Sequence, residues 1–167
     1  MKTILYQKRF YAILLFCLVG LFSVSAYSQS TVYFFMKKIG GNIDLRLKLN
    51  GKEILKINPP VKKTYPADDD TFRIPHYIYS PWFKKCTINK EGKVLFSFDA
   101  KQTNTTNLKV SNMFAEIQLN LTEGSTHYVY LTNKGLFDMQ LKELTEKEAK
   151  KLMNDKKYVS LPEYVEQ

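Results

Sequence analysis

The residues FAEIQLNLTEGSTHYVYL, positions 114–131, carry the strongest secondary-structure signal in this chain. In the first half, Ile117, Leu119 and Leu121 alternate with polar residues, which is the period of a strand that buries one face. The residues TEGS then supply a polar turn, in which Gly124 can adopt positive φ. The sequence HYVYL returns with aromatic and β-branched residues, which favour strands. The pattern predicts a β-hairpin.

Two further segments predict hairpins by the same reasoning. In Ile43–Ile57 a clean apolar–polar alternation leads into Asn50-Gly51, the strongest short-range signal for a type I′ turn. In Cys86–Ala100 the turn residues are Lys-Glu-Gly, and the apolar residues of the second strand are expected to face inward. These apolar residues are Val94, Phe96 and Phe98.

The remaining segments complete an all-β pattern that ends in one helix. TVYFFM at 31–36 predicts a buried first strand, and Phe137–Leu141 predicts a last one. Thr145 and Glu148 form a capping box, which predicts a helix over Glu146–Asn154, followed by a loosely held tail. Short strands at even intervals predict an antiparallel β-sandwich, immunoglobulin-like or related, with one short C-terminal helix.

The first 26 residues have the pattern of a signal peptide. Basic residues precede the apolar run Ala12–Val24, and Val24-Ser25-Ala26 offers small residues at the positions a signal peptidase reads. We expect cleavage after Ala26, with a retained transmembrane anchor as the alternative. The predicted organisation is a signal peptide at 1–26, a sandwich domain at 27–144, and a helix with a tail at 145–167.

Charge and cysteine content restrict the environment and the partners. Cleavage removes three basic and no acidic residues, so the net charge falls from +9 to +6. Lysines occur as scattered doublets, typical of a solvated surface, although attraction to an anionic glycan or lipid headgroup is the alternative. Export disfavours nucleic acid as a partner. Cys86 is the only cysteine after cleavage, so stability must come from the apolar core, and export without disulfides favours a bacterial envelope.

The proline-rich segment 58–85 is the predicted binding region. Five prolines between Asn58 and Phe83 predict irregular structure, with only Tyr77–Ser80 resembling a strand, and long irregular segments often carry function. Its aromatic and lysine residues could stack on a sugar or anchor a protein if they are exposed, whereas the alternative is that the rings plug the core. These residues are Tyr77, Tyr79, Trp82, Phe83, Lys84 and Lys85.

No catalytic, metal or cofactor site is predicted. The chain lacks the Gly-x-Ser-x-Gly, His-Glu-x-x-His and phosphate-loop motifs. The run Asp68-Asp69-Asp70 lacks the spacing of a calcium loop and is interpreted as a solvated acidic loop, with an adventitious cation site as the alternative. Cys86 could act with His76 or His127 only if the fold brought them together, and we expect a buried, inert thiol and His127 on the polar face of its strand.

Several motifs together resemble a domain-of-unknown-function family of short bacterial exported all-β domains ending in a helix. The motifs are the leader, VYFF at 32–35, NGKEI at 50–54, EGSTHYVYL at 123–131 and LKELTEKEAKKLM at 141–153. The family has no established catalytic residues, so the resemblance implies an envelope-facing β domain and assigns no role to any residue.

The sequence therefore favours an exported, non-catalytic β-sandwich that acts as a binding or structural module at the bacterial cell envelope. Its location would be the periplasm, the outer surface or the medium, and its partner an envelope protein or glycan. Contact with the membrane is expected only through the cleaved leader. The alternative is a small hydrolase or transferase that uses Cys86 with a histidine.

Overall fold

The structure is a computed structural model that describes residues 29–37, 39–40, 42–57, 61–65, 76–103, 110–133 and 139–166. The predicted leader, the acidic loop Asp68–Asp70 and Phe137 lie outside these residues. The elements are β1 (Ser30–Met36), β2 (Ile39–Gly40), β3 (Asn42–Leu49), β4 (Lys52–Ile57), β5 (Val61–Tyr65), β6 (His76–Tyr79), β7 (Trp82–Ile88), β8 (Gly92–Thr103), β9 (Val110–Leu121), β10 (Thr126–Asn133), β11 (Met139–Glu143), α2 (Glu146–Met153) and β12 (Val159–Val165).

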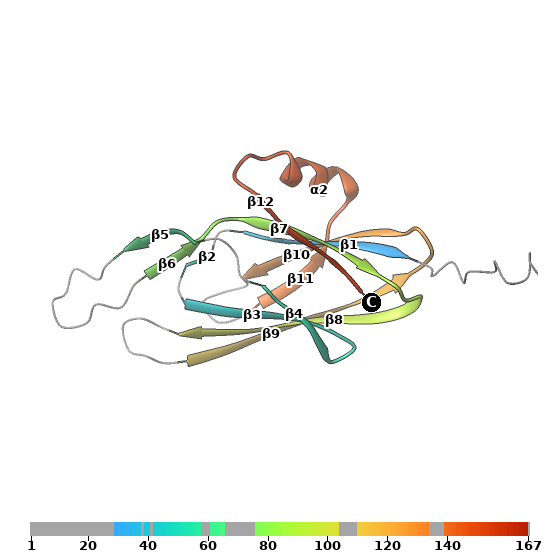
Figure 1. Ribbon diagram of the computed structural model, residues 1–167, viewed down its shortest axis with the longest axis horizontal. Helices are drawn as coiled ribbons and strands as arrows, with labels where there is room; N and C mark the ends of the chain where they lie inside the picture. Colours follow the sequence, from blue (N-terminus) through green and yellow to red (C-terminus); the bar gives the residue numbers. More distant parts are fainter. Residues whose placement is uncertain are drawn as a thin grey trace, which may run out of the picture.

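Two sheets pack face to face, and the predicted all-β sandwich with one short helix is confirmed (Figure 1). The first sheet has the order β11-β10-β1-β7-β12, and the second has the order β4-β3-β8-β9. A small sheet, β2-β6-β5, extends from one end (Figure 1). The first sheet is mixed rather than purely antiparallel, because β1 pairs with β10 and β7 pairs with β12 in parallel.

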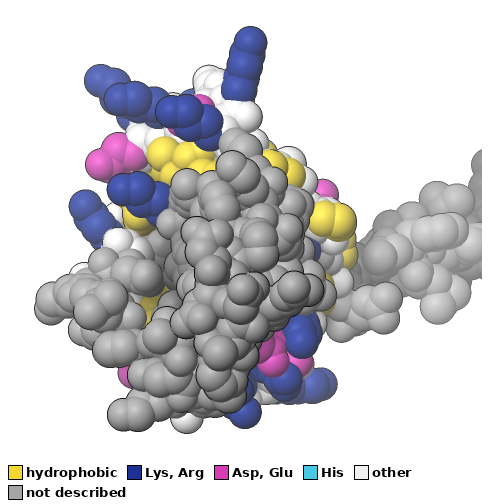
Figure 2. Space-filling model, turned by 90° about the vertical axis from the view of Figure 1, so that its left-hand side faces the viewer, with side chains coloured by type: hydrophobic (Ala, Val, Ile, Leu, Met, Phe, Trp, Pro, Cys, Tyr) yellow, Lys and Arg dark blue, Asp and Glu magenta, His cyan; other side chains and the backbone are white. Residues whose placement is uncertain are grey.

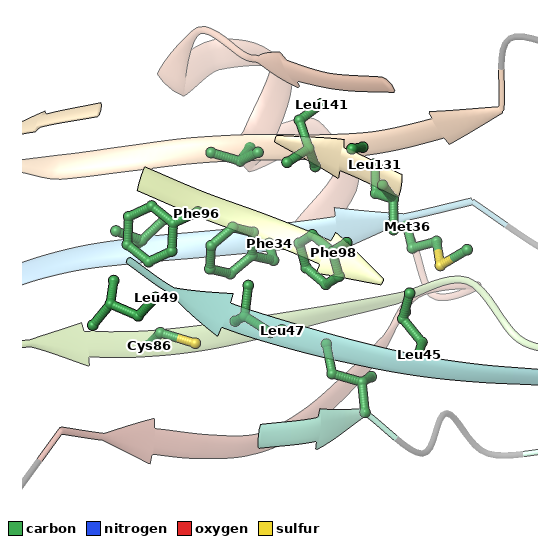
Figure 3. Packing of buried hydrophobic residues seen from close by; sticks show 14 of the residues in the cluster. Phe34, Met36, Leu45, Leu47, Leu49, Cys86, Phe96, Phe98, Leu131 and Leu141 are labelled. Atoms are coloured by element: carbon green, nitrogen blue, oxygen red, sulfur yellow. The ribbon is translucent and has the colours of Figure 1, made fainter. Parts of the chain in front are cut away.

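The core lies between the two sheets and is rich in aromatic rings (Figure 3). Phe34 of β1 meets Phe96 and Phe98 of β8 edge to face, with ring centroids 5.4 and 5.3 Å apart. Edge-to-face contact is a preferred aromatic geometry, and burying one such side chain contributes about 1.5–3 kcal/mol. The inward positions predicted in β8 are therefore confirmed.

The hairpin predicted over Ile43–Ile57 is also confirmed. β3 and β4 pair in antiparallel fashion, and Asn50 and Gly51 have φ values of 48° and 80°. Two successive positive φ values are what a type I′ turn requires. The side-chain amide oxygen of Asn50 also accepts a hydrogen bond from Leu95 N at 2.9 Å, which ties the turn to β8.

The hairpin predicted over 114–131 is wrong, although its strands and turn are correct. β9 belongs to the four-stranded sheet and β10 to the five-stranded sheet, so the turn crosses from one layer to the other. The start of β1 holds the turn: Gly124 N donates to Gln29 O at 2.9 Å, and Ser30 Oγ donates to Thr122 O at 2.8 Å. Alternation predicts which face is buried, and both strands bury their faces in the same core from opposite sides.

The hairpin predicted over Cys86–Ala100 is wrong for the same reason. β7 lies in the five-stranded sheet and β8 in the four-stranded sheet. The segment from Asn58 to Phe83 is also more regular than predicted, since β5 pairs with β6 and β7 already begins at Trp82. Pro81 lies between β6 and β7 rather than within a strand, which is where proline is tolerated.

The C-terminal segment is a strand and not the loosely held tail that was predicted. β12 pairs in parallel with β7 and is offset by an irregularity between Leu161 and Tyr164. The preceding helix is confirmed, with a capping box between Thr145 and Glu148 and a fully buried Ala149 facing the sheet. Among the described residues, no helix has the length and apolar character needed to span a membrane.

Candidate binding groove

The residues of the predicted aromatic and lysine surface point to different sides of the sheet. In β7, Trp82 and Lys84 face the core, whereas Phe83 and Lys85 face outward, because successive side chains in a strand alternate. Trp82 is 0% exposed, and its indole nitrogen finds no hydrogen-bond partner among the described residues. Tyr77 lies in β6, as does Tyr79, and their side chains are outside the description. Trp82 and Phe83 therefore do not share one binding surface, and the indole ring of Trp82 is buried in the core.

The two lysines hold β12 against β7. Lys84 is only 8% exposed, and its ammonium donates to the backbone carbonyl of Pro162. Lys85 Nζ forms a hydrogen-bonded ion pair with Glu163 Oε1 at 2.9 Å. The hydrogen bond to Glu163 is the main reason that the pKa of Lys85 is raised. Both side chains reach across to the C-terminal strand, so their first role is structural.

The outward-facing rings form a second apolar layer beneath α2. Tyr33 stacks on Tyr128 with centroids 5.5 Å apart, and Phe35 contacts Phe83 at 5.9 Å. Tyr158, in the turn after α2, hydrogen-bonds Tyr130, and burial is the main cause of its raised pKa, followed by that hydrogen bond. The outward aromatic residues therefore have a structural role, because the helix packs on them.

The thiol and the imidazole proposed for catalysis are held apart. Cys86 is fully buried, and burial raises the pKa of its thiol to about 12, so the thiolate is scarce at neutral pH. Cys86 and His127 both pair with Val32, from opposite sides of β1, which places their strands about 10 Å apart. A direct hydrogen bond between the two side chains is therefore not formed.

His127 lies on the inward side of β10, and the prediction that it lies on the polar face is wrong. It shares this side with Val129 and Leu131, at the end of the strand, where Glu143 of β11 supplies a polar partner. His127 Nδ1 and Glu143 Oε1 are 2.8 Å apart. Nε2 is buried, and no described residue hydrogen-bonds to it, so this dyad holds neither a hydroxyl nor a thiol nucleophile. In the same described part of the chain, no cluster of three or more His, Cys, Asp or Glu residues could hold a metal ion.

A groove of about 740 Å³ lies where the outer strands of the two sheets face each other. Its walls are the β3–β4 hairpin on one side and β12 on the other, with the β7–β8 turn nearby. The volume falls in the range of small-ligand sites, which is about 300–1,000 Å³. The lining residues are Leu49, Asn50, Lys52, Glu53, Ile54, Lys90, Glu163, Tyr164, Val165 and Glu166.

The β12 wall of the groove is built around Glu166. Its carboxylate accepts from Asn89 N at 3.0 Å and pairs with Lys90 Nζ at 2.9 Å, and Glu166 N donates to Thr87 O at 2.9 Å. Tyr164 is half-buried beside it, and burial raises the pKa of its phenol. These contacts fix the end of β12 against the β7–β8 turn, so this wall is preorganised.

The groove combines apolar and charged groups that remain accessible. Val165 is 53% exposed, which is unusual for a large apolar side chain, and Ile54 is half-buried opposite. Glu163 and Glu53 each keep an accessible carboxylate beside them, although ion pairs with lysine or arginine hold both. Such a mixture can anchor a ligand through apolar contact and orient it through hydrogen bonds.

The two walls also carry backbone groups that the described strands leave unpaired. β4 pairs only with β3, and β12 pairs only with β7, within the part of the chain that the structure describes. Edge strands present N–H and C=O groups that can pair with another chain. Pro162 and the irregularity between Leu161 and Tyr164 interrupt the edge of β12, and β4 has an irregularity of its own where its pairing with β3 shifts register between Leu47 and Lys48.

On the outer face of the four-stranded sheet, several charged side chains form a network of ion pairs that includes Glu53 of the groove wall. Arg46 pairs with Asp44 at 3.0 Å and with Glu53 at 3.1 Å, and Lys56 pairs with Asp44 at 3.1 Å. The hydrogen bond from Arg46 is the main reason that the pKa of Asp44 is lowered. This network holds Asp44, Arg46, Glu53 and Lys56 together.

Sequence reasoning missed the groove because it is assembled from three distant segments: residues 49–54, residue 90 and residues 163–166. One signal was available in YVSLPEYV at 158–165, which is rich in β-branched and aromatic residues that favour strands. Comparison of the chain with protein-family models, with curated proteins and with solved structures found no significant match. The family resemblance therefore stays a prediction.

Proposed function

We propose that the chain is an exported, non-catalytic β-sandwich that acts as a binding module at the bacterial cell envelope, with the groove between β4 and β12 as its binding site. The observation that carries the proposal is the groove itself: a concave site with an exposed valine, accessible carboxylates and two strand edges. The leader-like sequence at 1–26 supports the location.

The partner is an envelope protein or glycan, and the groove favours a protein segment in extended form. An extended segment can pair its backbone with β4 while one of its side chains covers Val165 and Ile54. Strand addition of this kind draws affinity from main-chain hydrogen bonds and specificity from side-chain pockets. A glycan would bind mainly through the polar rim, because among the described lining residues the aromatic ring is that of Tyr164, which is half-buried.

A capture experiment with the mature chain, residues 27–167, tests the site. Val165→Glu places a charge at the rim of the groove, and Phe114→Glu is the matched control, because Phe114 is 54% exposed on the outer face of the other sheet. Immobilised wild type and control should retain the same component from envelope fractions, and Val165→Glu should lose it. Equal retention by all three proteins, with circular dichroism showing that all are folded, would remove the groove as the site.

Cell fractionation tests the location. A full-length, C-terminally tagged chain should be recovered in a shortened form from the envelope or the medium. Recovery of the uncut chain in the cytoplasm would contradict export.

A further inference from the structure

The helix α2 and the turn after it carry four lysines that have no acidic partner among the described residues. They are Lys147, Lys151, Lys156 and Lys157, and we call them the lysine corner. All four are exposed. Lysine side chains project from the side of the molecule on which α2 lies, around a small apolar patch (Figure 2).

The acidic residues of the same segment are committed to local structure. Glu143 contacts His127, and Glu146 pairs with Lys150 at 2.6 Å. Glu148 caps the helix through Thr145, and Asp155 Oδ1 accepts from the backbone N of Lys157 at 2.9 Å. These acidic residues therefore take part in local structure, and no described residue neutralises the four ammonium groups through an ion pair.

The four lysines of the corner repel one another, and no contact within the described fold requires them. Lys147 and Lys151 are four residues apart on one helix face, where like charges repel, and this face is opposite the buried Ala149. Lys151 is favoured by the negative end of the helix dipole, but Lys147 lies in the first turn, where a cation is disfavoured. Lys156 and Lys157 follow as adjacent cations, so an external anion would relieve the repulsion among all four.

We propose that the lysine corner docks the domain onto an anionic phospholipid surface. Basic clusters of this size are attracted to anionic bilayers, and each lysine near the surface contributes to the attraction. Val159 follows the corner by two residues and is 37% exposed, so an accessible apolar side chain lies next to the lysines in the sequence. This contact is additional to the predicted role of the leader and is independent of the groove.

A bilayer fits the corner better than an anionic glycan does. A bilayer presents many anions in one plane and accepts an apolar side chain, whereas sugar recognition commonly uses an exposed aromatic ring. The aromatic residue next to the corner is Tyr158, which is half-buried and hydrogen-bonded to Tyr130. Its ring is committed to the layer beneath α2.

Vesicle co-sedimentation of the mature chain tests the proposal. The vesicles contain equal parts of phosphatidylglycerol and phosphatidylcholine, or phosphatidylcholine alone. The test variant is K147Q/K156Q/K157Q, which keeps Lys151 for the helix terminus, and the matched control is K37Q/K93Q/K101Q, which removes three exposed lysines from other places. Wild type and control should bind the anionic vesicles within a few-fold of each other, and the test variant should bind roughly 100-fold more weakly.

Three results would overturn the proposal. The control variant could lose as much affinity as the test variant, which would indicate a general effect of net charge. Wild type could bind neutral vesicles as tightly as anionic ones. A soluble anionic polysaccharide could bind with the same dependence on the lysine corner while the vesicles do not bind, which would assign the corner to a glycan. Circular dichroism of both variants separates each result from loss of folding.

Discussion

The two sides of the sandwich differ in how their edge strands meet. On one side, β9 and β11 lie against each other and bury Met113, Met139 and Leu141. On the other side, β4 and β12 leave a groove lined by the exposed Val165. On the closed side, contact between the edge strands stabilises the fold. On the open side, apolar surface and backbone groups remain available to a partner.

The largest expected effect is the contrast between a buried side chain on the closed side and an exposed one on the open side. Leu141→Ala should lower the free energy of unfolding by about 2–5 kcal/mol, because it leaves a cavity in the core. Val165→Ala should change it by no more than about 0.5 kcal/mol. Urea titration of the mature chain measures both, and similar losses would mean that the two sides do not differ.

A smaller effect is expected at the wall of the groove. Tyr164→Ala should cost about 1–2 kcal/mol, less than a fully buried aromatic residue, and should loosen β12 from β7. Because Cys86 of β7 pairs with Tyr164 of the neighbouring strand β12, its reaction with a thiol reagent should become faster in Tyr164→Ala and stay slow in Phe114→Ala. An unchanged labelling rate would show that β12 does not protect the thiol.

The turn that carries the chain between the layers is expected to depend on one buried hydroxyl. Ser30 is fully buried, and its Oγ donates to the Thr122 carbonyl. Ser30→Ala should therefore cost about 1 kcal/mol, because the Thr122 carbonyl loses one of its two donors among the described residues and keeps only Ser125 N, at 2.9 Å. Ser160→Ala, at an exposed position of β12, should have no measurable effect in the same urea titration, and equal effects would contradict this role of Ser30.

The smallest effect concerns pH at the open side. Hydrogen bonds from Lys85 and then from Thr87 lower the pKa of Glu163 below its ordinary value of 4.5. The folded state stabilises the Glu163 carboxylate more than the unfolded state does. Its contribution to the free energy of unfolding is therefore complete above pH 4.5 and is lost as the pH falls through the lowered pKa. The urea midpoint of wild type should exceed that of Glu163→Gln at neutral pH, and the difference should shrink on acidification.

High salt should also reduce that difference, because the pair is exposed. If the difference in urea midpoint between wild type and Glu163→Gln grew as the pH fell, the ionised form of Glu163 would not be the form that stabilises the fold.

The sequence predicts the strands and their buried faces better than it predicts their neighbours. The alternation of apolar and polar residues in 114–121 indicates that one face of the strand is buried, and Gly124 indicates that the chain turns. Neither signal distinguishes a hairpin from a crossing between the two sheets. The hairpin at Asn50-Gly51 was predictable because a type I′ turn itself matches the twist of two paired strands. β12 escaped prediction because most of its residues are exposed and Pro162 interrupts it.

The candidate site was harder to predict than the fold. The aromatic residues of 77–83 looked like one surface in the sequence, but strand alternation sends Trp82 into the core and Phe83 to the layer beneath α2. The groove depends on the placement of β12 beside the β3–β4 hairpin, which no local pattern encodes. The lysine doublets 150–151 and 156–157 are visible in the sequence, but only the structure shows that Lys151, Lys156 and Lys157 have no acidic partner among the described residues.

Photo-crosslinking in living cells tests most directly whether the groove is where this domain meets its partner. A photoreactive amino acid at Val165 reports on the groove, and the same amino acid at Phe114 reports on an equally exposed position of the other sheet. The proposed function predicts a discrete crosslinked product to an envelope component from position 165 and none from position 114. A product from position 114 alone, or identical products from both positions, would contradict it.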